Sequence, residues 1–140
     1  MVKLSLLQSH CLPILLYAIE SLKLPTSQLI EINSWWNSVY RKIFSYHKWE
    51  SVRLLISMLD RLDIHHTVNL RSILFLTKMS SENSNNSVVK SLIDSYSLCG
   101  DYRAIFERYG CKDFWSVSKI RLTIYNSFKE SVSTHKLPHI

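Results

Sequence analysis

Chain-breaking residues are scarce in this sequence. Only 2 glycines and 3 prolines occur among 140 residues, and no glycine-rich turn is present. A sheet of many strands needs frequent turns, and those turns rely on glycine and proline. The hydrophobic share of 46% is typical of a folded protein rather than a disordered one. The sequence therefore predicts an all-α protein, a small bundle of about six or seven helices.

Residues 2–22 form a mostly apolar segment. Its apolar side chains fall on nearly the whole circumference of a helix, so we expect a buried helix at the centre of the domain. Pro13 cannot donate a backbone hydrogen bond, which predicts a kink or a restart within this helix. Leu24 precedes Pro25 and therefore avoids the helical region, so the helix is expected to end before it.

A single apolar stripe marks the second predicted helix, which Thr26 or Ser27 is expected to cap. Apolar residues follow at steps of three and four, the period of one helical face. They are Leu29, Ile32, Trp36, Val39 and Ile43. A third helix is expected over about residues 50–62, and Asp63 is expected to cap a fourth over residues 64–79. The stripe of the third helix is Val52, Leu55, Leu59 and Leu62.

The stretch SSENSNNS is the only low-complexity segment and a linker candidate. We therefore expect a helical unit over residues 1–80, a linker over 81–87 and a C-terminal helical segment over 88–140. Within the last segment, two helices are expected to end at Gly100 and Gly110. The final helix carries one apolar face, formed by Val117, Ile120, Ile124 and Phe128.

The basic charge is concentrated in one part of the chain. The net charge is +6, and residues 41–80 hold seven Lys and Arg side chains against three acidic ones. Residues 37–55 interleave aromatic with cationic side chains. Trp36, Tyr40 and Phe44 recur every four residues, which is the spacing of a buried face, so we expect most of them to pack inward.

The cationic side chains of this part form the candidate binding surface. Lys and Arg side chains contact phosphate, and an aromatic side chain can stack on sugars or bases. The first-rank candidates are Arg41, Lys42, Lys48, Arg53 and Trp49. The second rank is Arg61, Arg71 and Lys78. The residue pattern alone fits two interpretations, a surface that binds nucleic acid and an ordinary solvated face.

No pattern of catalytic residues is recognisable. Two glycines cannot build a phosphate-binding loop, and neither G-x-S-x-G nor HExxH occurs. Asp60 and Asp63 are interpreted as a surface charge and a helix cap rather than as paired catalytic carboxylates. Adjacent His65 and His66 point about 100° apart on a helix and cannot chelate one metal ion together. We therefore expect no catalytic residue, no metal site and no cofactor.

Cysteine usage and the N-terminal segment bear on localisation. Cys11, Cys99 and Cys111 are odd in number and widely spaced, so we expect free thiols and an intracellular protein, cytoplasmic or nuclear. The uncharged span from Leu4 to Ile19 is shorter than the roughly 20 residues that a membrane helix needs. No small-residue cleavage site follows it, so neither a targeting signal nor a membrane partner is expected.

Several short motifs follow one another in the first part of the chain. LLYAIE occupies residues 15–20, NSVYRKIF residues 37–44 and WESV residues 49–52, and RLD stands at 61–63. Their order and spacing resemble the thumb region just downstream of the palm in reverse transcriptases of non-LTR retrotransposons. Ala18 is a departure, because that family commonly has glycine at this position.

The resemblance covers roughly residues 3–78. It implies a helical bundle that grips the template–primer duplex behind a polymerase site. The family holds its metal ions with a palm motif that ends in paired aspartates, and this chain has no Asp-Asp pair, so we expect no enzyme activity. A remnant open reading frame, a truncated gene model and a reused helical module all fit a thumb without its palm.

Two functions follow from these observations. The first is weak, largely non-specific binding of RNA or DNA backbone by a basic helical face. The alternative is a helical interaction or structural fragment that needs a partner, such as the missing polymerase palm, to cover its apolar surface. The near-continuous apolar face of residues 11–22 favours the alternative, because such a helix needs neighbours on every side.

Overall fold

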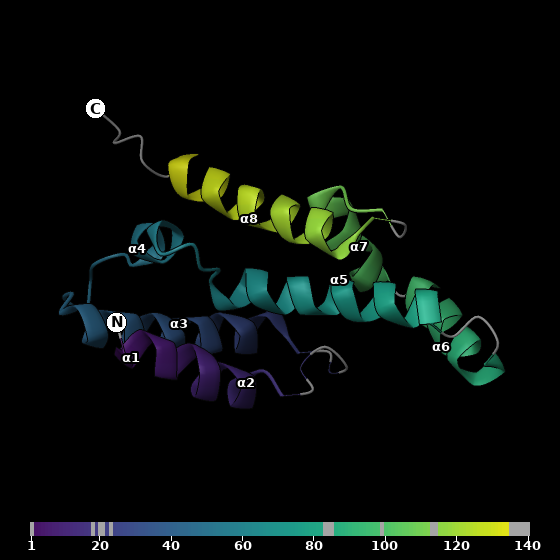
Figure 1. The fold of residues 1–140 in the computed structure, drawn as a ribbon, viewed down its shortest axis with the longest axis horizontal. Helices are drawn as coiled ribbons and strands as arrows, with labels where there is room; N and C mark the ends of the chain where they lie inside the picture. The colour runs from purple at the N-terminus through teal and green to yellow at the C-terminus, as the bar shows by residue number, and fades with distance from the viewer. Residues whose placement is uncertain are drawn as a thin grey trace. The chain divides into compact units, whose positions relative to one another are not determined.

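The structure is a computed structural model that describes residues 2–17, 19, 22, 24–82, 86–98, 100–112 and 115–134 (Figure 1). All regular secondary structure in these residues is helical. The elements are α1 (Val2–Leu6), η1 (Leu7–Cys11), α2 (Leu12–Leu15), α3 (Thr26–Phe44), α4 (Arg53–Met58), α5 (Ile64–Glu82), α6 (Ser87–Leu98), α7 (Gly100–Tyr109) and α8 (Val117–Thr134). Because α1, η1 and α2 run on as one N-terminal helix, the described part of the chain holds seven helices. The all-α prediction is confirmed.

The chain divides into two compact units, Met1–Val68 and Asn69–Leu137. This division falls inside α5, whereas the sequence suggests a boundary at the low-complexity stretch. Helix α5 extends into that stretch and ends at Glu82, and α6 begins at Ser87. Residues 83–85 lie outside the described residues, so a linker there stays a prediction.

The N-terminal helix changes its winding before Pro13. In η1, the backbone N–H of Leu12 donates to the carbonyl of Leu7, five residues earlier instead of four. This wide turn lies directly before Pro13, whose ring clashes with a carbonyl of the preceding turn in a regular helix. The predicted restart is therefore present. The α-helix ends at Leu15, earlier than predicted, and part of residues 16–23 lies outside the described residues.

This helix is only half-buried, so the prediction that it lies at the centre of the domain is wrong. Its buried apolar side chains include Leu4, Leu7 and Leu16. The N-terminal apolar residues, defined here as the exposed ones, are Val2, Leu6, Ile14, Tyr17 and Leu22, with exposed fractions of 74%, 52%, 77%, 83% and 57%. A helix with apolar side chains all round is normally buried on every side, but here other parts of the chain cover only some of its faces.

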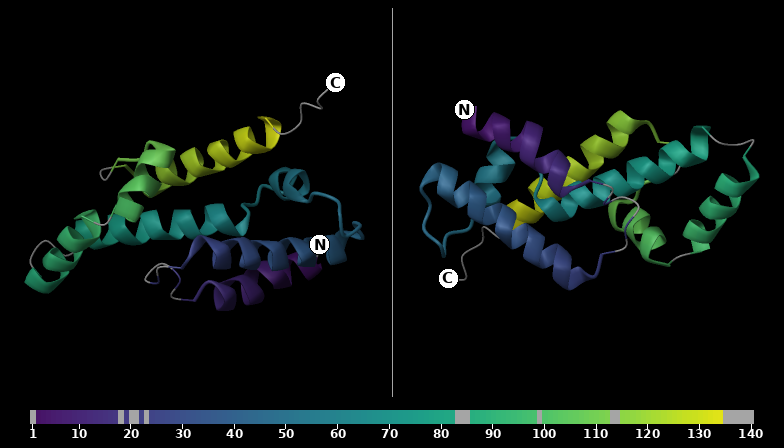
Figure 2. Two further views of the ribbon diagram at one scale, coloured as in Figure 1. Left: turned by 180° about the vertical axis from the view of Figure 1, so that it is seen from behind. Right: turned by 90° about the horizontal axis from the view of Figure 1, so that it is seen from below.

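Helix α3 provides the centre of the first unit instead. Tyr40 is fully buried and Trp36 is buried, as their spacing predicts, whereas Phe44 is half-buried. The Tyr40 ring packs edge-on against Trp36 and stacks with Phe44. Gln8 Nε2 donates to the Tyr40 hydroxyl at 3.0 Å, and this bond ties the N-terminal helix to α3, beside which it lies in Figure 2.

The start of α3 has no side-chain cap. Pro25 is the N-cap residue, so the prediction that Thr26 or Ser27 caps this helix is wrong. The Pro25 carbonyl accepts from the backbone N–H groups of Gln28 and Leu29 at 3.0 and 3.2 Å. The fixed φ of proline suits this position, because the ring sets the direction in which the chain enters the helix.

Helix α4 is shorter than the predicted helix over residues 50–62. It spans Arg53–Met58, and Asp60 follows with a left-handed φ of 52°. The backbone N–H of Arg61 then donates to the carbonyl of Ile56 at 3.0 Å, a hydrogen bond that closes a helix end of this kind. Most of the predicted stripe still faces inward, since Val52 and Leu62 are buried and Leu55 and Leu59 are half-buried.

Asp63 caps α5, as predicted. Its Oδ1 accepts from the backbone N–H of His66 at 2.8 Å and from His66 Nδ1 at 2.7 Å. Burial of the carboxylate by itself raises its pKa, but the hydrogen bonds from His66 and the charges of His66 and His65 outweigh this effect. The pKa of Asp63 therefore lies below its ordinary value of 3.8. Asn33 Oδ1 accepts from the backbone N–H of Ile64 at 3.2 Å and joins the start of α5 to α3.

The second unit contains most of α5 together with α6, α7 and α8. Helix α7 ends at Gly110, as predicted, because this glycine has a φ of +61° and the N–H of Cys111 donates to the Phe106 carbonyl. Val117, predicted on the apolar face of the last helix, is exposed. The buried apolar residues of this unit are Ile73, Leu76, Tyr109, Cys111, Ile120, Ile124, Phe128 and Val132.

We expect Asp63→Ala to destabilise the start of α5 by about 1–2 kcal/mol at neutral pH, because the His66 N–H loses its acceptor. The native pKa of Asp63 lies below its unfolded value, so the carboxylate contributes fully at neutral pH. Its contribution disappears as the pH falls through the native value. Urea unfolding followed by circular dichroism at neutral and strongly acidic pH should show a deficit that shrinks in acid. Glu31→Ala on the exposed surface of α3 is the control, and equal effects of both substitutions would contradict the cap.

Candidate nucleic-acid interface

The α3–α4 loop, residues 45–52, leaves α3 in a defined direction. Ser45 adopts a left-handed conformation with φ 57° and ψ 35°. The backbone N–H of Tyr46 donates to the Arg41 carbonyl at 2.9 Å, which closes the last turn of the helix. The loop therefore begins from a fixed point on the first unit.

Further hydrogen bonds close the loop on itself and on Arg41. The backbone N–H of His47 donates to Glu50 Oε2 at 2.5 Å, and the Glu50 N–H donates to the His47 carbonyl at 3.1 Å. The Nε of Arg41 donates to the Glu50 carbonyl at 2.9 Å. The half-buried Arg41 thus positions the loop through both its backbone and its side chain. A phosphate contact by this residue stays a prediction.

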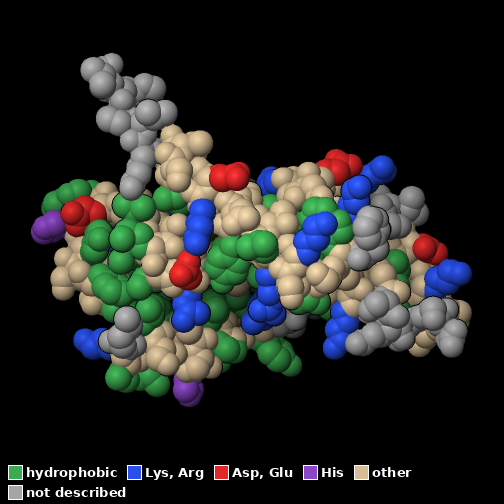
Figure 3. Space-filling model, turned by 45° about the horizontal axis from the view of Figure 1, so that its top comes forward, with side chains coloured by type: hydrophobic (Ala, Val, Ile, Leu, Met, Phe, Trp, Pro, Cys, Tyr) green, Lys and Arg blue, Asp and Glu red, His purple; other side chains and the backbone are tan. Residues whose placement is uncertain are grey.

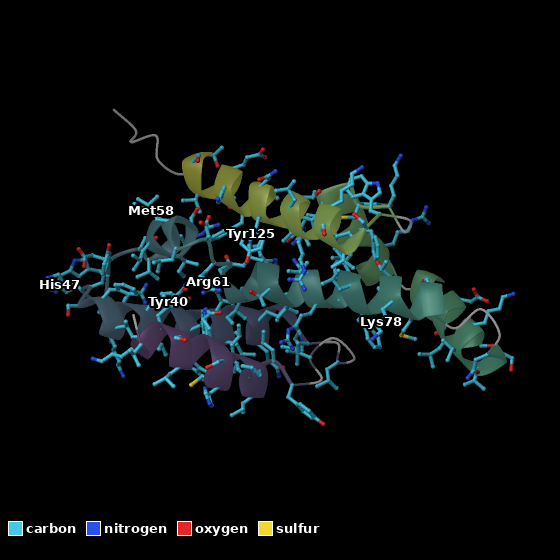
Figure 4. The ribbon with its side chains drawn as sticks, in the orientation of Figure 1. Tyr40, His47, Met58, Arg61, Lys78 and Tyr125 are labelled. Carbon is cyan, nitrogen blue, oxygen red and sulfur yellow. The ribbon has the colours of Figure 1, made fainter. Side chains whose placement is uncertain are left out.

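His47 and Trp49 stack on each other within the loop. Their ring centroids lie 4.8 Å apart and their planes differ by 1°. Trp49 is 81% exposed, so the imidazole covers one face of the indole and the other face is open to solvent. Figure 4 shows His47 at the end of α3, beyond the position of Tyr40. The loop therefore presents an aromatic surface that is already formed.

Exposed cations occur in the last turn of α3 and in the loop that carries this stack. Lys42 is in the last turn of α3, and Lys48 separates His47 from Trp49 in the sequence. Trp35 is 61% exposed and precedes Lys42 by seven residues, which is about two helical turns, so both lie on the same face of α3. The end of α3 therefore combines cationic and aromatic side chains on accessible surface.

An open groove of about 360 Å³ adjoins the end of α3. Its lining consists of Val2, Lys3 and Leu4 from α1 and Ile43 and Phe44 from α3. The walls are apolar except for Lys3, which is exposed. Packing of the N-terminal helix against α3 therefore brings a further cation, distant in sequence, close to the α3–α4 loop.

The other predicted contact residues are placed differently. Arg53 is half-buried at the start of α4, and Arg61 is exposed but lies well away from His47 in Figure 4. Arg71 and Lys78 belong to the second unit, where Arg71 is half-buried and Lys78 is exposed on α5. The structure thus gathers Lys42, Lys48 and Trp49 as exposed side chains at the end of α3 and in the loop that follows, with the half-buried Arg41 in the same last turn of the helix.

The local electrostatics favour an anion. Glu50 is the only acidic residue in the α3–α4 loop, and its carboxylate already accepts the backbone N–H of His47. Lys48 in the same loop, Lys42 in the last turn of α3 and Lys3 in the groove beside Phe44 are all exposed. Phosphate therefore meets more positive than negative charge at this end of the first unit.

The described residues also bear on the predictions about metal sites, cysteines and membrane helices. Among them no group of three or more His, Cys, Asp or Glu side chains is placed to hold a metal ion. Cys11 is an exposed free thiol and Cys111 a buried one whose pKa is raised by burial, whereas Cys99 lies outside the described residues. No helix in the same residues has the length and apolar character required to cross a membrane.

The predicted set of contact residues lacks Lys3, Trp35 and His47. The sequence does contain a sign that Trp35 is exposed. Trp36 faces inward, and successive residues of a helix point about 100° apart, so Trp35 is turned away from the buried face. The stacking of His47 on Trp49 depends on the loop conformation. The position of Lys3 depends on how α1 packs against α3. No local sequence pattern predicts the stacking of His47 or the position of Lys3.

Comparison with known proteins finds no family model, curated protein or solved structure that matches this chain. The interface is therefore defined by its own geometry. That geometry is a fixed loop with an exposed indole and two exposed lysines at the end of one helix.

We expect Arg41→Ala to loosen the α3–α4 loop, because it removes the hydrogen bond to the Glu50 carbonyl. A hydrogen bond from a charged group contributes about 1.5–3 kcal/mol, so amide exchange at Tyr46 and Glu50 should accelerate roughly tenfold or more. Hydrogen exchange followed by mass spectrometry measures this change. Lys42→Ala removes an equal charge from the neighbouring position and should leave these amides unchanged. Unaltered exchange in Arg41→Ala would show that its side chain does not hold the loop.

Proposed function

We propose that this protein binds RNA or DNA backbone through the end of α3 and the α3–α4 loop, without catalysing a reaction. The observation that carries the proposal is that Lys48 and Trp49 are exposed in a loop already held by hydrogen bonds, and Lys42 is exposed in the helical turn before it. Lysines neutralise phosphates, and an exposed indole stacks on sugars or bases. A loop that is already ordered loses little conformational entropy on binding.

The proposed binding is weak and largely independent of sequence. Contacts to phosphate set the register of a protein on nucleic acid but carry no sequence information. Few exposed cations gather at this site, and Lys42 and Lys48 are the two that carry the proposal. A small number of phosphate contacts gives a modest affinity that depends strongly on salt.

We also propose that the chain derives from the C-terminal part of a non-LTR retrotransposon reverse transcriptase. The order and spacing of the motifs at residues 15–63 support this origin. In that family the thumb grips nucleic acid, which favours a binding surface over a merely solvated face. The proposal includes no catalytic role, because the sequence has no paired aspartates to hold two metal ions.

The double substitution Lys42→Ala/Lys48→Ala should weaken binding to duplex DNA and flatten its salt dependence. Each neutralised phosphate contributes about −0.9 to the slope of log K against log salt, so the slope should change by roughly two units. Fluorescence anisotropy with a labelled duplex over a series of salt concentrations measures this slope. Helix content, measured by circular dichroism, should stay the same, because both side chains are exposed.

The matched control is Lys90→Ala/Lys112→Ala, which removes the same charge from exposed positions in the second unit. This variant should retain nearly all of the wild-type slope. If both double variants lose affinity equally, the attraction comes from net charge alone and the end of α3 is not a binding site. Arg41 and Arg53 are left intact, because a half-buried side chain also affects packing.

A second candidate function rests on the N-terminal apolar residues. Val2 and Leu6 lie one turn apart, as do Ile14 and Tyr17, and all four are more than half exposed. Hydrophobic side chains reach the surface in several places in the view of Figure 3. Apolar surface of this kind favours a partner that covers it, and we propose a protein partner, such as a polymerase palm, as the alternative.

We expect Leu6→Gln/Tyr17→Ser to reduce the binding of a dye that fluoresces on apolar surfaces, and to shift any self-associated protein towards the monomer. Both side chains are exposed, so removing them from the surface lowers its apolar area without opening the core. Dye titration and size-exclusion chromatography measure the two effects. Leu92→Gln/Val88→Ser on α6, where the replaced apolar side chains are 42% and 70% exposed, is the control. A monomer that binds no dye would count against this alternative.

A further inference from the structure

Trp49 offers an aromatic face that the fold itself does not use. Its indole is 81% exposed, and among the described residues its ring stacks on His47, with the two centroids 4.8 Å apart. Burying a large aromatic side chain is strongly favourable, and Trp36 shows that this unit can bury an indole. The exposed face of Trp49 is therefore available to a ligand rather than to the core.

The stack is also held in place before any ligand arrives. The backbone on either side of Lys48 is closed by the hydrogen bonds between His47 and Glu50, and the Nε of Arg41 fixes the Glu50 carbonyl. The imidazole supports the indole from behind with nearly parallel planes. Such an arrangement resembles the flat platform on which single-stranded nucleic acid stacks its bases.

Only an unpaired base can use such a platform. In a closed duplex each base lies between its neighbours, and a side chain reaches base edges in the grooves or the backbone. In a single strand, or at an unpaired end, a base can turn outward and stack on an aromatic side chain. An exposed flat ring, with one exposed lysine next to it in the loop and another in the last turn of α3, suits a base and its neighbouring phosphates in both shape and charge.

We infer that the His47–Trp49 stack binds one unpaired nucleobase while Lys42 and Lys48 hold the neighbouring phosphates, so that the protein prefers single strands and unpaired ends over closed duplex. This inference rests on the proposed nucleic-acid function and deepens it by naming the form of the strand. Trp49 supplies the stacking face, His47 supports it, and the two lysines supply sequence-independent attraction.

The test compares three labelled ligands of equal length by fluorescence anisotropy: a single strand, its duplex and an abasic strand that keeps the phosphates. The wild-type protein should bind the single strand more tightly than the other two. Trp49→Ala should lower single-strand affinity roughly tenfold and leave the abasic strand and the duplex unaffected. Trp49→Phe should retain most of the affinity, since it keeps an aromatic face. Tyr17→Ala, which removes an equally exposed aromatic ring from the N-terminal segment, should change none of the three affinities.

The outcomes separate this inference from the proposed function. If the wild-type protein binds normal and abasic strands equally, and Lys42→Ala/Lys48→Ala weakens both, backbone binding stands and base stacking is overturned. Absence of binding to all three ligands overturns both. If Trp49→Ala instead weakens binding to vesicles of anionic phospholipid and leaves the strands unaffected, the indole serves a membrane surface and the inference fails.

Discussion

The ring of Tyr40 organises the first unit. It is fully buried, packs between Trp36 and Phe44 along α3, and accepts a hydrogen bond from Gln8 of the N-terminal helix. Burying such a side chain contributes about 1.5–3 kcal/mol, and the bonded hydroxyl avoids the cost of an unsatisfied polar group. Once Tyr40 points inward, the 100° step of the helix fixes the directions of the residues that follow it. Lys42 consequently faces solvent, and Arg41 lies at the boundary where it can reach the loop.

Arg41 shows that a cation in a basic segment can also stabilise the fold. Its carbonyl accepts from Tyr46 and its guanidinium donates to the Glu50 carbonyl, so the residue links α3 to the loop at two points. A loop fixed in this way can hold an exposed indole and an exposed lysine without support from the core. The Arg41 side chain thereby supports the conformation of the candidate interface, and a phosphate contact by its remaining N–H groups stays a prediction.

Apolar and cationic surfaces occur together on the first unit. The groove beside α3 is lined by apolar side chains of α1 and α3 together with Lys3, and the N-terminal apolar residues continue along the same helix. The proposed nucleic-acid binding uses the lysines and the Trp49 stack, whereas the proposed protein partner would cover Val2, Leu6 and Tyr17. The two proposed functions therefore draw on different residues, and both can hold for one molecule.

The local sequence pattern correctly predicted the all-α fold, the buried face of α3, the cap at Asp63 and the end of α7 at Gly110. Each of these depends on helical periodicity or on hydrogen bonds within a few residues, which the order of the amino acids specifies directly. The exposure of the N-terminal helix, the shortness of α4 and the stacking of His47 on Trp49 were decided by tertiary structure. They depend on which neighbours cover a surface and on left-handed conformations at Ser45 and Asp60, neither of which is a glycine. Coverage arises from contacts between residues distant in sequence, and loop closure arises from left-handed turns and from hydrogen bonds at irregular spacings, so no periodic pattern along the chain records either of them.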